Sequence, residues 1–188
     1  MKKRINKHYL GVTLMMTTAI SWSNNTVAIN LSGTAFDRAA SHYKLDPLLV
    51  YAVALTESAY GRGNGVISPW QWSLRGPDGP FYGHNAHETR LKFEEFRHLY
   101  GKQFDVGMMQ ISLHWNGDRV PSLESLLDNN TNLMTGAQVL HEAISSSPGD
   151  LQLGIGRYHH WEDEDRARHY GSRVIAIWQN LKNLKHQE

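Results

Sequence analysis

The sequence predicts a single, mainly α-helical domain behind a short N-terminal export segment. Its 188 residues fit one domain, and a hydrophobic content of 40% is enough to build a core. From residue 34 onward, apolar residues recur at intervals of three and four positions, which is the period of an α-helix. Turns rich in Gly, Pro and Asn separate these stretches. The sequence contains no internal repeat.

Residues 1–28 have the pattern of a secretory signal peptide. Four Lys and Arg residues precede an apolar stretch at 9–22, and small residues lead to Ala28. We expect cleavage after Ala28, with Ser23 as the alternative position. A retained membrane anchor is disfavoured because the apolar stretch is short and rich in Thr. A bacterial lipid anchor would need a cysteine at the cleavage point. Residues 29–188 are therefore expected in the periplasm.

The formal charge of +1 at pH 7 is the sum of the charges of two unlike segments. Residues 1–28 contain four cations and no acid, which leaves 15 Lys and Arg against 18 Asp and Glu, or −3, in residues 29–188. This charge argues against a nucleic-acid-binding surface. Because the chain has no Cys, disulfides, thiolate zinc sites and cysteine nucleophiles are excluded.

The first two helices are predicted at 34–44 and from residue 47 to about residue 60. Apolar residues at three- and four-residue spacing mark one face of the first helix. Asp46 and Pro47 suit the N-cap and first turn of the second. Since residues 48–55 are apolar throughout, the second helix should be buried on all sides, and Gly61 should end it.

Residues 61–84 are rich in Gly, Pro and aromatic side chains, which indicates a structured loop or a short β-hairpin. Asn85 and Glu88 resemble a capping box that opens a helix to about residue 100. Further helices are predicted at 122–128, 131–145, 148–158 and 162–183, with Ser147 and Pro148 as cap and first turn of the third.

Glu57 is the first ionisable group after the apolar run of the second helix. A carboxylate at a helix C-terminus faces the negative end of the macrodipole, and partial burial also disfavours its charge. Both effects raise its pKa. A carboxylic acid that stays protonated near neutral pH is what general-acid cleavage of a glycosidic bond requires. The competing interpretation is a surface Glu at a fraying helix end.

Three short motifs occur in order along the chain: Leu-Thr-Glu-Ser at 55–58, Gly-Met-Met-Gln-Ile at 107–111 and Ile-Gly-Arg-Tyr at 155–158. With the lead-in at 43–49, this set resembles the lytic transglycosylases of the soluble-lytic-transglycosylase (SLT) type. In that family a helix ends in Glu-Ser, a Gly-Leu-Met-Gln-Ile segment follows, and an Ala-Tyr-Asn segment comes later. The resemblance covers residues 34–181 and implies a lysozyme-like helical fold acting on peptidoglycan glycan strands.

The resemblance implies that Glu57 is the single catalytic acid/base. It would protonate the oxygen between N-acetylmuramic acid and N-acetylglucosamine, and then accept the proton of the muramyl C6 hydroxyl as a 1,6-anhydro ring closes. Ordinary glycosidases use two carboxylates, whereas this reaction needs one and no cofactor or metal. Ser58 would hydrogen-bond near Glu57 or the substrate. Gln110, beside Met109, would line the cleft, and Tyr158 would lie close to the acid.

Two features depart from the family pattern. Glu57 and Gln110 are 53 positions apart, which implies an insertion at about 61–105. Its aromatic residues are either a sugar-stacking platform or the core of the insertion; they are Trp70, Trp72 and Tyr82. This longer form resembles transglycosylases that accompany conjugation or pilus machinery. Near the end, Tyr158 is followed by His159 instead of Asn, so His159 either takes over the role of that Asn or the role is lost.

Other functions are less well supported. The eleven histidines lack the His-Glu-x-x-His spacing of a zinc protease, so no metal site is predicted. A lysozyme-like hydrolase is an alternative, with Asp78, Glu88 or Asp105 as its second carboxylate. A non-catalytic peptidoglycan-binding scaffold is the third hypothesis. Small size and the lack of a coiled-coil seam favour a monomer.

Overall fold

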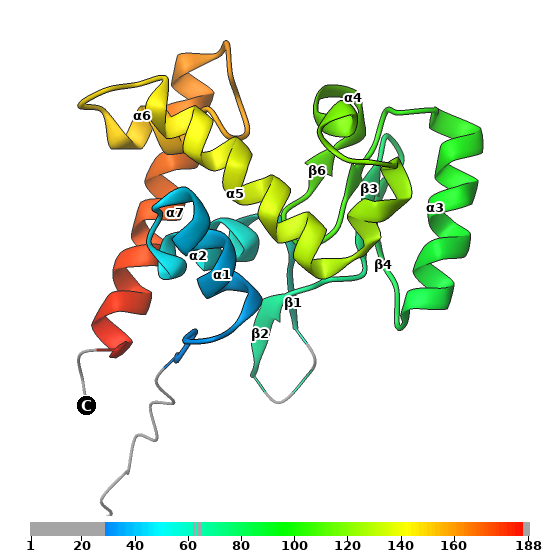
Figure 1. Cartoon of the computed structure of the whole chain (residues 1–188), viewed down its shortest axis with the longest axis horizontal. Helices are drawn as coiled ribbons and strands as arrows, with labels where there is room; N and C mark the ends of the chain where they lie inside the picture. The colour runs from blue at the N-terminus through cyan, green and yellow to red at the C-terminus, as the bar shows by residue number, and fades with distance from the viewer. Residues whose placement is uncertain (1–28, 62, 64, 186–188) are drawn as a thin grey trace, which may run out of the picture.

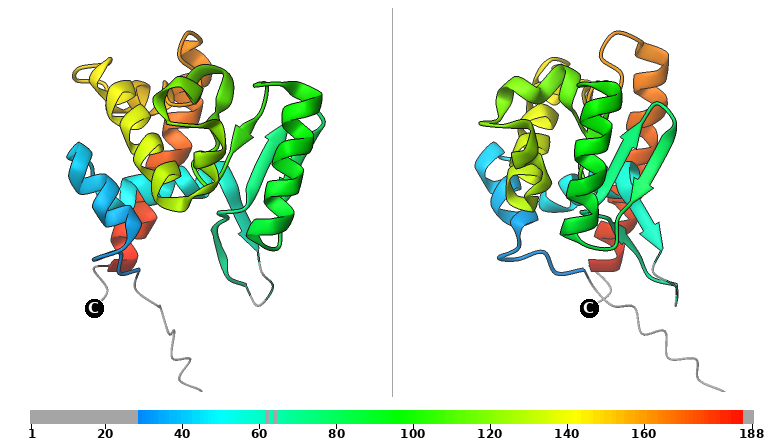
Figure 2. Two further views of the ribbon diagram at one scale, coloured as in Figure 1. Left: turned by 45° about the vertical axis from the view of Figure 1, so that its right-hand side comes forward. Right: turned by 90° about the vertical axis from the view of Figure 1, so that its right-hand side faces the viewer.

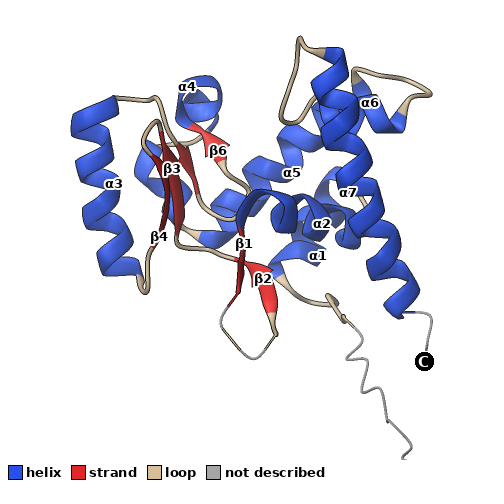
Figure 3. Cartoon of the chain, turned by 180° about the vertical axis from the view of Figure 1, so that it is seen from behind, coloured by secondary structure: helices blue, strands red, loops and turns tan. Residues whose placement is uncertain are grey.

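The computed structural model describes residues 29–185 except residues 62 and 64. The signal-peptide prediction at 1–28 and its cleavage sites therefore lie outside the described residues. The strands and helix α3 (Ala86–Tyr100) lie to one side of the molecule, and most of the helices lie to the other (Figures 1 and 3). The architecture is mainly helical with small antiparallel sheets, as the sequence predicts.

Helices α1 (Ala35–Tyr43) and α2 (Pro47–Ser58) confirm the first two predicted helices. Thr34 caps α1 by accepting a hydrogen bond from the Asp37 N–H. Asp46 caps α2 by accepting from the Leu48 N–H, and Pro47 occupies the first helical position. Residues 48–54 of α2 are buried except for Tyr51, which is half-buried, because this helix packs against both α1 and the last helix, α7 (Glu164–Lys185).

Two small sheets follow α2. In the first, β1 (Ala59–Gly61) pairs antiparallel with β2 (Ile67–Pro69). The second has the strand order β4-β3-β5-β6, built from β3 (Ser73–Gly76), β4 (Gly79–Tyr82), β5 (Asp105–Val106) and β6 (Ile111–Ser112). The β3–β4 hairpin confirms the predicted short hairpin within 61–84. Helix α3 lies along this sheet (Figure 2), where Phe93 and Phe96 make edge contacts with Phe104.

Helix α5 (Asn129–Ser145) extends from the sheet side to the helical side (Figure 1) and packs against α1 and the helices next to it in the chain. Before α5 come α4 (Leu113–Asn116) and the 3-10 helices η1 (Gly117–Arg119) and η2 (Leu123–Leu127). After it, α6 (Leu151–Gly156) packs closely on α7. A Cβ on Gly156 would lie 2.0 Å from the Ala167 carbonyl oxygen, so only Gly allows this approach.

Three details differ from the sequence prediction. The helix expected at 122–128 is the 3-10 helix η2, because Ser122 caps a tight turn that ends at Asp128, the cap of α5. The helix expected at 148–158 begins at Leu151, where Asp150 and not Ser147 is the cap. Strands β5 and β6 were not predicted, since two-residue strands have too short a pattern to be recognised.

Within residues 29–185, apart from 62 and 64, no helix has the length and hydropathy of a membrane span. The His, Asp and Glu side chains of the same residues form no group of three that could hold a metal ion.

Candidate active site

Glu57 lies in the last turn of α2, and its side chain is only 8% exposed. Burial raises the pKa of this carboxyl from an ordinary 4.5 to about 7, because the charged form loses its hydration. The negative charge of Asp105 raises the pKa further, whereas Arg75 and Arg173 lower it. Glu57 is therefore a buried acid that is substantially protonated near neutral pH.

Tyr170, in α7, holds this carboxyl in place. Its hydroxyl donates a 2.5 Å hydrogen bond to Oε1 of Glu57, and its ring is buried. Burial and the Glu57 charge raise the pKa of Tyr170 well above its ordinary value, so the phenol remains a donor. Within the described part of the chain, Glu57 Oε2 has no hydrogen-bond partner. The arrangement fixes one carboxyl oxygen and leaves the other to carry a proton.

His159 covers the same pair from the loop after α6. Its Nδ1 lies 3.7 Å from Oε1 of Glu57, and its ring stacks on Tyr170 with centroids 5.0 Å apart. Burial, His160 and two nearby arginines lower the pKa of His159, which favours a neutral imidazole. His159 thus lies within contact distance of the buried acid.

The Gly-Met-Met-Gln segment joins β5 to β6 in a strained turn. Gly107 has φ +76° and Gln110 has φ +43°, and a Cβ on Gly107 would collide with Asn132. Asn132, buried in α5, accepts a 2.9 Å hydrogen bond from the Met109 N–H and donates to the Val106 and Leu126 carbonyls. One buried amide therefore sets the shape of the turn.

The side chains of this turn face different neighbours. Gln110 donates through Nε2 to the Gly107 carbonyl (2.7 Å) and to Ser73 Oγ (3.1 Å), and remains partly exposed. Met109 is fully buried against Gly136 of α5, where a larger residue would clash. The Tyr158 hydroxyl donates a 2.7 Å hydrogen bond to the Met109 carbonyl.

Ser58 connects the turn to the helix that carries Glu57. Its Oγ lies 2.8 Å from the Met108 carbonyl and 3.0 Å from the Ala54 carbonyl, and it accepts from the Trp70 N–H at 3.2 Å. The side chain is 1% exposed. Its hydrogen-bonding groups are thus occupied by backbone, which makes Ser58 a link between α2, the turn and the strand region.

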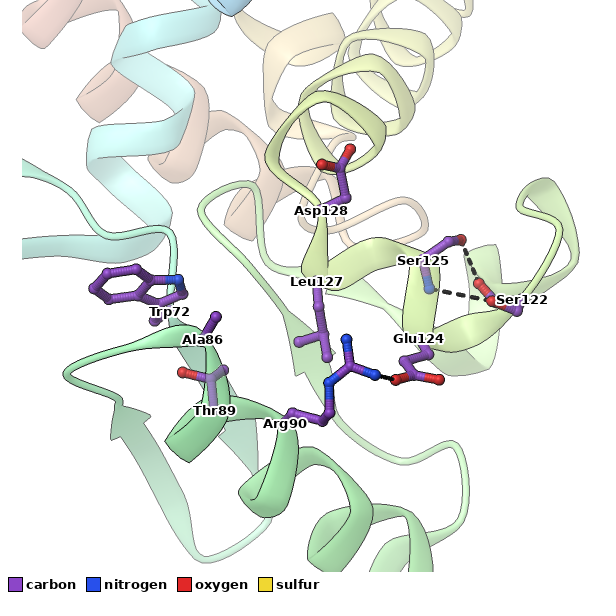
Figure 4. Close-up of a pocket in the computed structure, with 9 residues that line it drawn as sticks. All are labelled: Trp72, Ala86, Thr89, Arg90, Ser122, Glu124, Ser125, Leu127 and Asp128. Carbon is purple, nitrogen blue, oxygen red and sulfur yellow. Dashed lines mark hydrogen bonds and ion pairs between the residues drawn. The ribbon is translucent and has the colours of Figure 1, made fainter.

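The predicted aromatic residues separate into two environments. Trp70 is 8% exposed, donates through Nε1 to the Gly83 carbonyl, and packs on Tyr60 and Trp72. Trp72 is half-buried and lines a depression of about 430 Å³. Figure 4 shows Trp72 and the start of α3 on one side of this depression and residues 122–128 on the other. Tyr82 is also half-buried and stacks on Tyr60 with ring centroids 5.1 Å apart, so Trp72 and Tyr82 are the more accessible of the three.

The structure brings Glu57 together with a residue that the sequence did not single out as functional. In the sequence, Tyr170 is one of the apolar and aromatic residues that recur at helical spacing along the last helix, a pattern that predicts a core residue. Asn132 gives no signal of its own in the sequence, since a single Asn in a helix has no distinctive pattern. Among the carboxylates considered as a second acid, Asp78 accepts from Tyr100 and Glu88 belongs to the α3 cap. Asp105 alone of the three influences the Glu57 pKa.

The chain was compared with models of known protein families. The family model "Transglycosylase SLT domain" matches residues 34–168. No match was found among curated proteins or among solved structures. The matched segment contains Glu57, the turn at 107–111 and Tyr158, and it ends two residues before Tyr170.

Proposed function

The chain belongs to the SLT transglycosylase family, and we propose that it cleaves the β-1,4 bond between N-acetylmuramic acid and N-acetylglucosamine with formation of a 1,6-anhydro-muramyl end. The observation that carries this proposal is Glu57: a buried carboxyl with a pKa of about 7, fixed through Oε1 and free at Oε2. Such a group can donate and accept a proton within one reaction at neutral pH.

The proposed reaction is a single-acid cycle. Protonated Glu57 gives its proton from Oε2 to the bridging oxygen, and the bond from the muramyl anomeric carbon to that oxygen breaks. The carboxylate then accepts the proton of the muramyl C6 hydroxyl, whose oxygen bonds to the anomeric carbon. Glu57 ends protonated, and no water is consumed. Since Tyr170 donates to Oε1, it stabilises the carboxylate between the two proton transfers.

The remaining site residues are proposed to bind and orient the glycan strand. Gln110 is partly exposed beside the turn and offers its amide to sugar hydroxyl or acetamido groups. Tyr158 and Met109 support that wall through their mutual hydrogen bond, and Ser58 supports it through Met108. Trp72 offers a stacking face for a sugar ring, and Trp70 supports it by edge contact.

The test is product analysis on purified sacculi. Residues 29–188 are incubated with sacculi, and the released muropeptides are weighed by mass spectrometry. Anhydro products, one water lighter than reducing-end products, are expected. Glu57→Gln should lower the rate by about 10³-fold or more while the circular dichroism spectrum stays unchanged. Wild-type activity in that variant would contradict the proposed role of Glu57. Release of reducing-end products alone by the wild-type protein would contradict the transglycosylase proposal.

A lysozyme-like hydrolase is the second candidate, and one observation favours it. Asp105 is close enough for its charge to act on Glu57, and its own pKa is raised to about 6, mainly by burial. It could activate a water in place of the C6 hydroxyl. The same sacculus assay separates the two chemistries. A non-catalytic scaffold, the third candidate, would release nothing.

The cellular setting is proposed on the same basis. Residues 1–28 are proposed to direct export to the periplasm, where the enzyme acts as a monomer without cofactor. Local opening of the cell wall for a conjugation, secretion or pilus apparatus is the proposed purpose. Deleting residues 2–28 should leave the protein in the cytoplasmic fraction; periplasmic recovery of that variant would contradict the export proposal.

A further inference from the structure

A depression of about 320 Å³ opens beside the catalytic carboxyl, and cationic side chains dominate its lining. It shares Tyr170 and His159 with the Glu57 cluster. The other lining residues come from the loop before α7 and the first three turns of that helix: His160, Asp165, Arg166, His169 and Arg173. Two arginines against one aspartate give the lining a formal charge of +1 with neutral histidines.

Within the described residues, the two arginines of this depression form a single ion pair. Arg173 forms no ion pair within the residues that the structure describes. Arg166 is 72% exposed and reaches only Asp163, with its Nε 3.3 Å from Oδ2. Burial lowers the pKa of His159, and the neighbouring His160 and Arg173 lower it further. A depression with this positive charge is suited to a carboxylate ligand.

We infer that this depression, termed here the basic pocket, binds a free carboxylate of the stem peptide carried by the muramyl residue at the scissile bond. The inference rests on the proposed function, because it takes peptidoglycan as the substrate. The stem peptide joins the muramyl ring through its lactyl group, and its first free carboxylate is the α-carboxylate of the second residue, D-Glu. Two residues of extended chain span about 7 Å.

The position of the pocket fits this reach. Tyr170 and His159 form both the wall of the pocket and the surroundings of the Glu57 carboxyl. With its lactyl group turned toward the pocket, a muramyl ring placed for proton transfer from Glu57 brings its peptide within reach of Arg173 and His169. Binding there would hold the ring in place and would favour strands that carry peptides over bare glycan.

The binding test uses two matched probes on the wild-type protein. One is N-acetylmuramyl-L-alanyl-D-glutamate with its γ-carboxyl blocked as a methylamide, and the other is its α-carboxamide. They differ only in the α-carboxylate, and neither has a glycosidic bond to cleave. Calorimetry should show the acid binding at least about tenfold more tightly. Equal affinity of the wild-type protein for the two probes would by itself overturn the inference.

A pair of double variants locates the binding. Arg166→Gln with His169→Gln should remove most of the preference for the acid probe. Arg97→Gln with His98→Gln makes the same changes on α3 and should leave the preference intact. Both pairs are at least partly exposed, so thermal unfolding should change little. A preference that survives the α7 double variant would contradict the assignment.

Cleavage assays then separate this inference from the proposed function. The α7 double variant should raise KM on peptide-bearing strands and leave cleavage of peptide-free strands unchanged. If the wild-type protein cleaves both kinds of strand but binds the two probes equally, the inference about the basic pocket is wrong and the proposed function stands. If it prefers the acid probe but cleaves neither kind of strand, the basic pocket stands as a binding site and the proposed function is wrong.

Discussion

The Tyr170 hydroxyl and the Glu57 carboxyl form a 2.5 Å hydrogen bond that joins α7 to the end of α2. The two helices also meet at the start of α2, where Trp178 Nε1 donates to Asp46 Oδ2 at 2.9 Å. The helix pair is thus fixed at both ends of α2, which limits the orientations of the carboxyl. Burial raises the pKa of Glu57 and Tyr170 lowers it, so the value of about 7 is a balance between the two.

Replacing Tyr170 with Phe should raise the pKa of Glu57 further, because the bond that favours the carboxylate is lost. The alkaline limb of the kcat/KM profile reports loss of the catalytic proton and should move to higher pH. The maximum rate should fall by about 10- to 100-fold, as expected when a hydrogen bond to a charged group is removed. Muropeptide release measured from pH 5 to 9 gives both quantities.

Tyr43→Phe is the matched control, since Tyr43 is a half-buried tyrosine of α1 with no hydrogen bond to the site. Its profile should follow the wild type. A Tyr170→Phe enzyme with reduced rate but an unmoved alkaline limb would mean that the tyrosine serves packing alone.

Asp105→Asn should act in the opposite direction. Its charge raises the pKa of Glu57, so the neutral amide should lower that pKa and move the alkaline limb to lower pH. In the transglycosylase mechanism the products remain anhydro and most of the activity survives. Activity as low as that of Glu57→Gln would instead identify Asp105 as the second carboxylate of a hydrolase.

The parts of the site that the sequence predicts are those encoded locally. The cap at Asp46, the apolar run of α2 and the position of Glu57 at its end all lie within about twelve residues. Tyr170 could not be paired with Glu57 in this way, because 113 positions separate them and an apolar helical stripe gives no partner. Ser58 shows the same limit: its motif suggests a substrate contact, whereas its hydroxyl partners are set by long-range packing.

Asn132→Ala should destabilise the protein by about 2–4 kcal/mol, because it removes three buried hydrogen bonds and leaves the Met109 N–H without a partner. The turn at 107–111 should loosen, and activity should fall even at temperatures where the protein is folded. Urea unfolding measures the first effect and muropeptide release the second. Asn130→Ala, in the same helix as Asn132, removes only an exposed hydrogen bond that Arg38 of α1 donates, and should change stability by less than about 1 kcal/mol. Equal effects of the two substitutions would contradict the role of Asn132.

Glu57→Gln should stabilise the protein at alkaline pH. With a pKa of about 7 in the folded state and an ordinary value of 4.5, Glu57 binds more protons folded than unfolded between these values. Wild-type stability therefore falls as pH rises through this window, and the loss is complete above pH 7. Gln has no charge to bury, so the variant should be more stable by about 2–4 kcal/mol at pH 8 and by almost nothing at pH 4.

Urea unfolding at the two pH values measures this difference, and the exposed Glu94→Gln on α3 is the control. The Glu94 variant should differ from the wild type by the same small amount at both pH values, since its side chain is hydrated in either state. If Glu57→Gln were instead less stable than the wild type at pH 8, the carboxylate would be stabilised by its surroundings. Glu57 would then be ionised at neutral pH, and the general-acid role proposed for it would be lost.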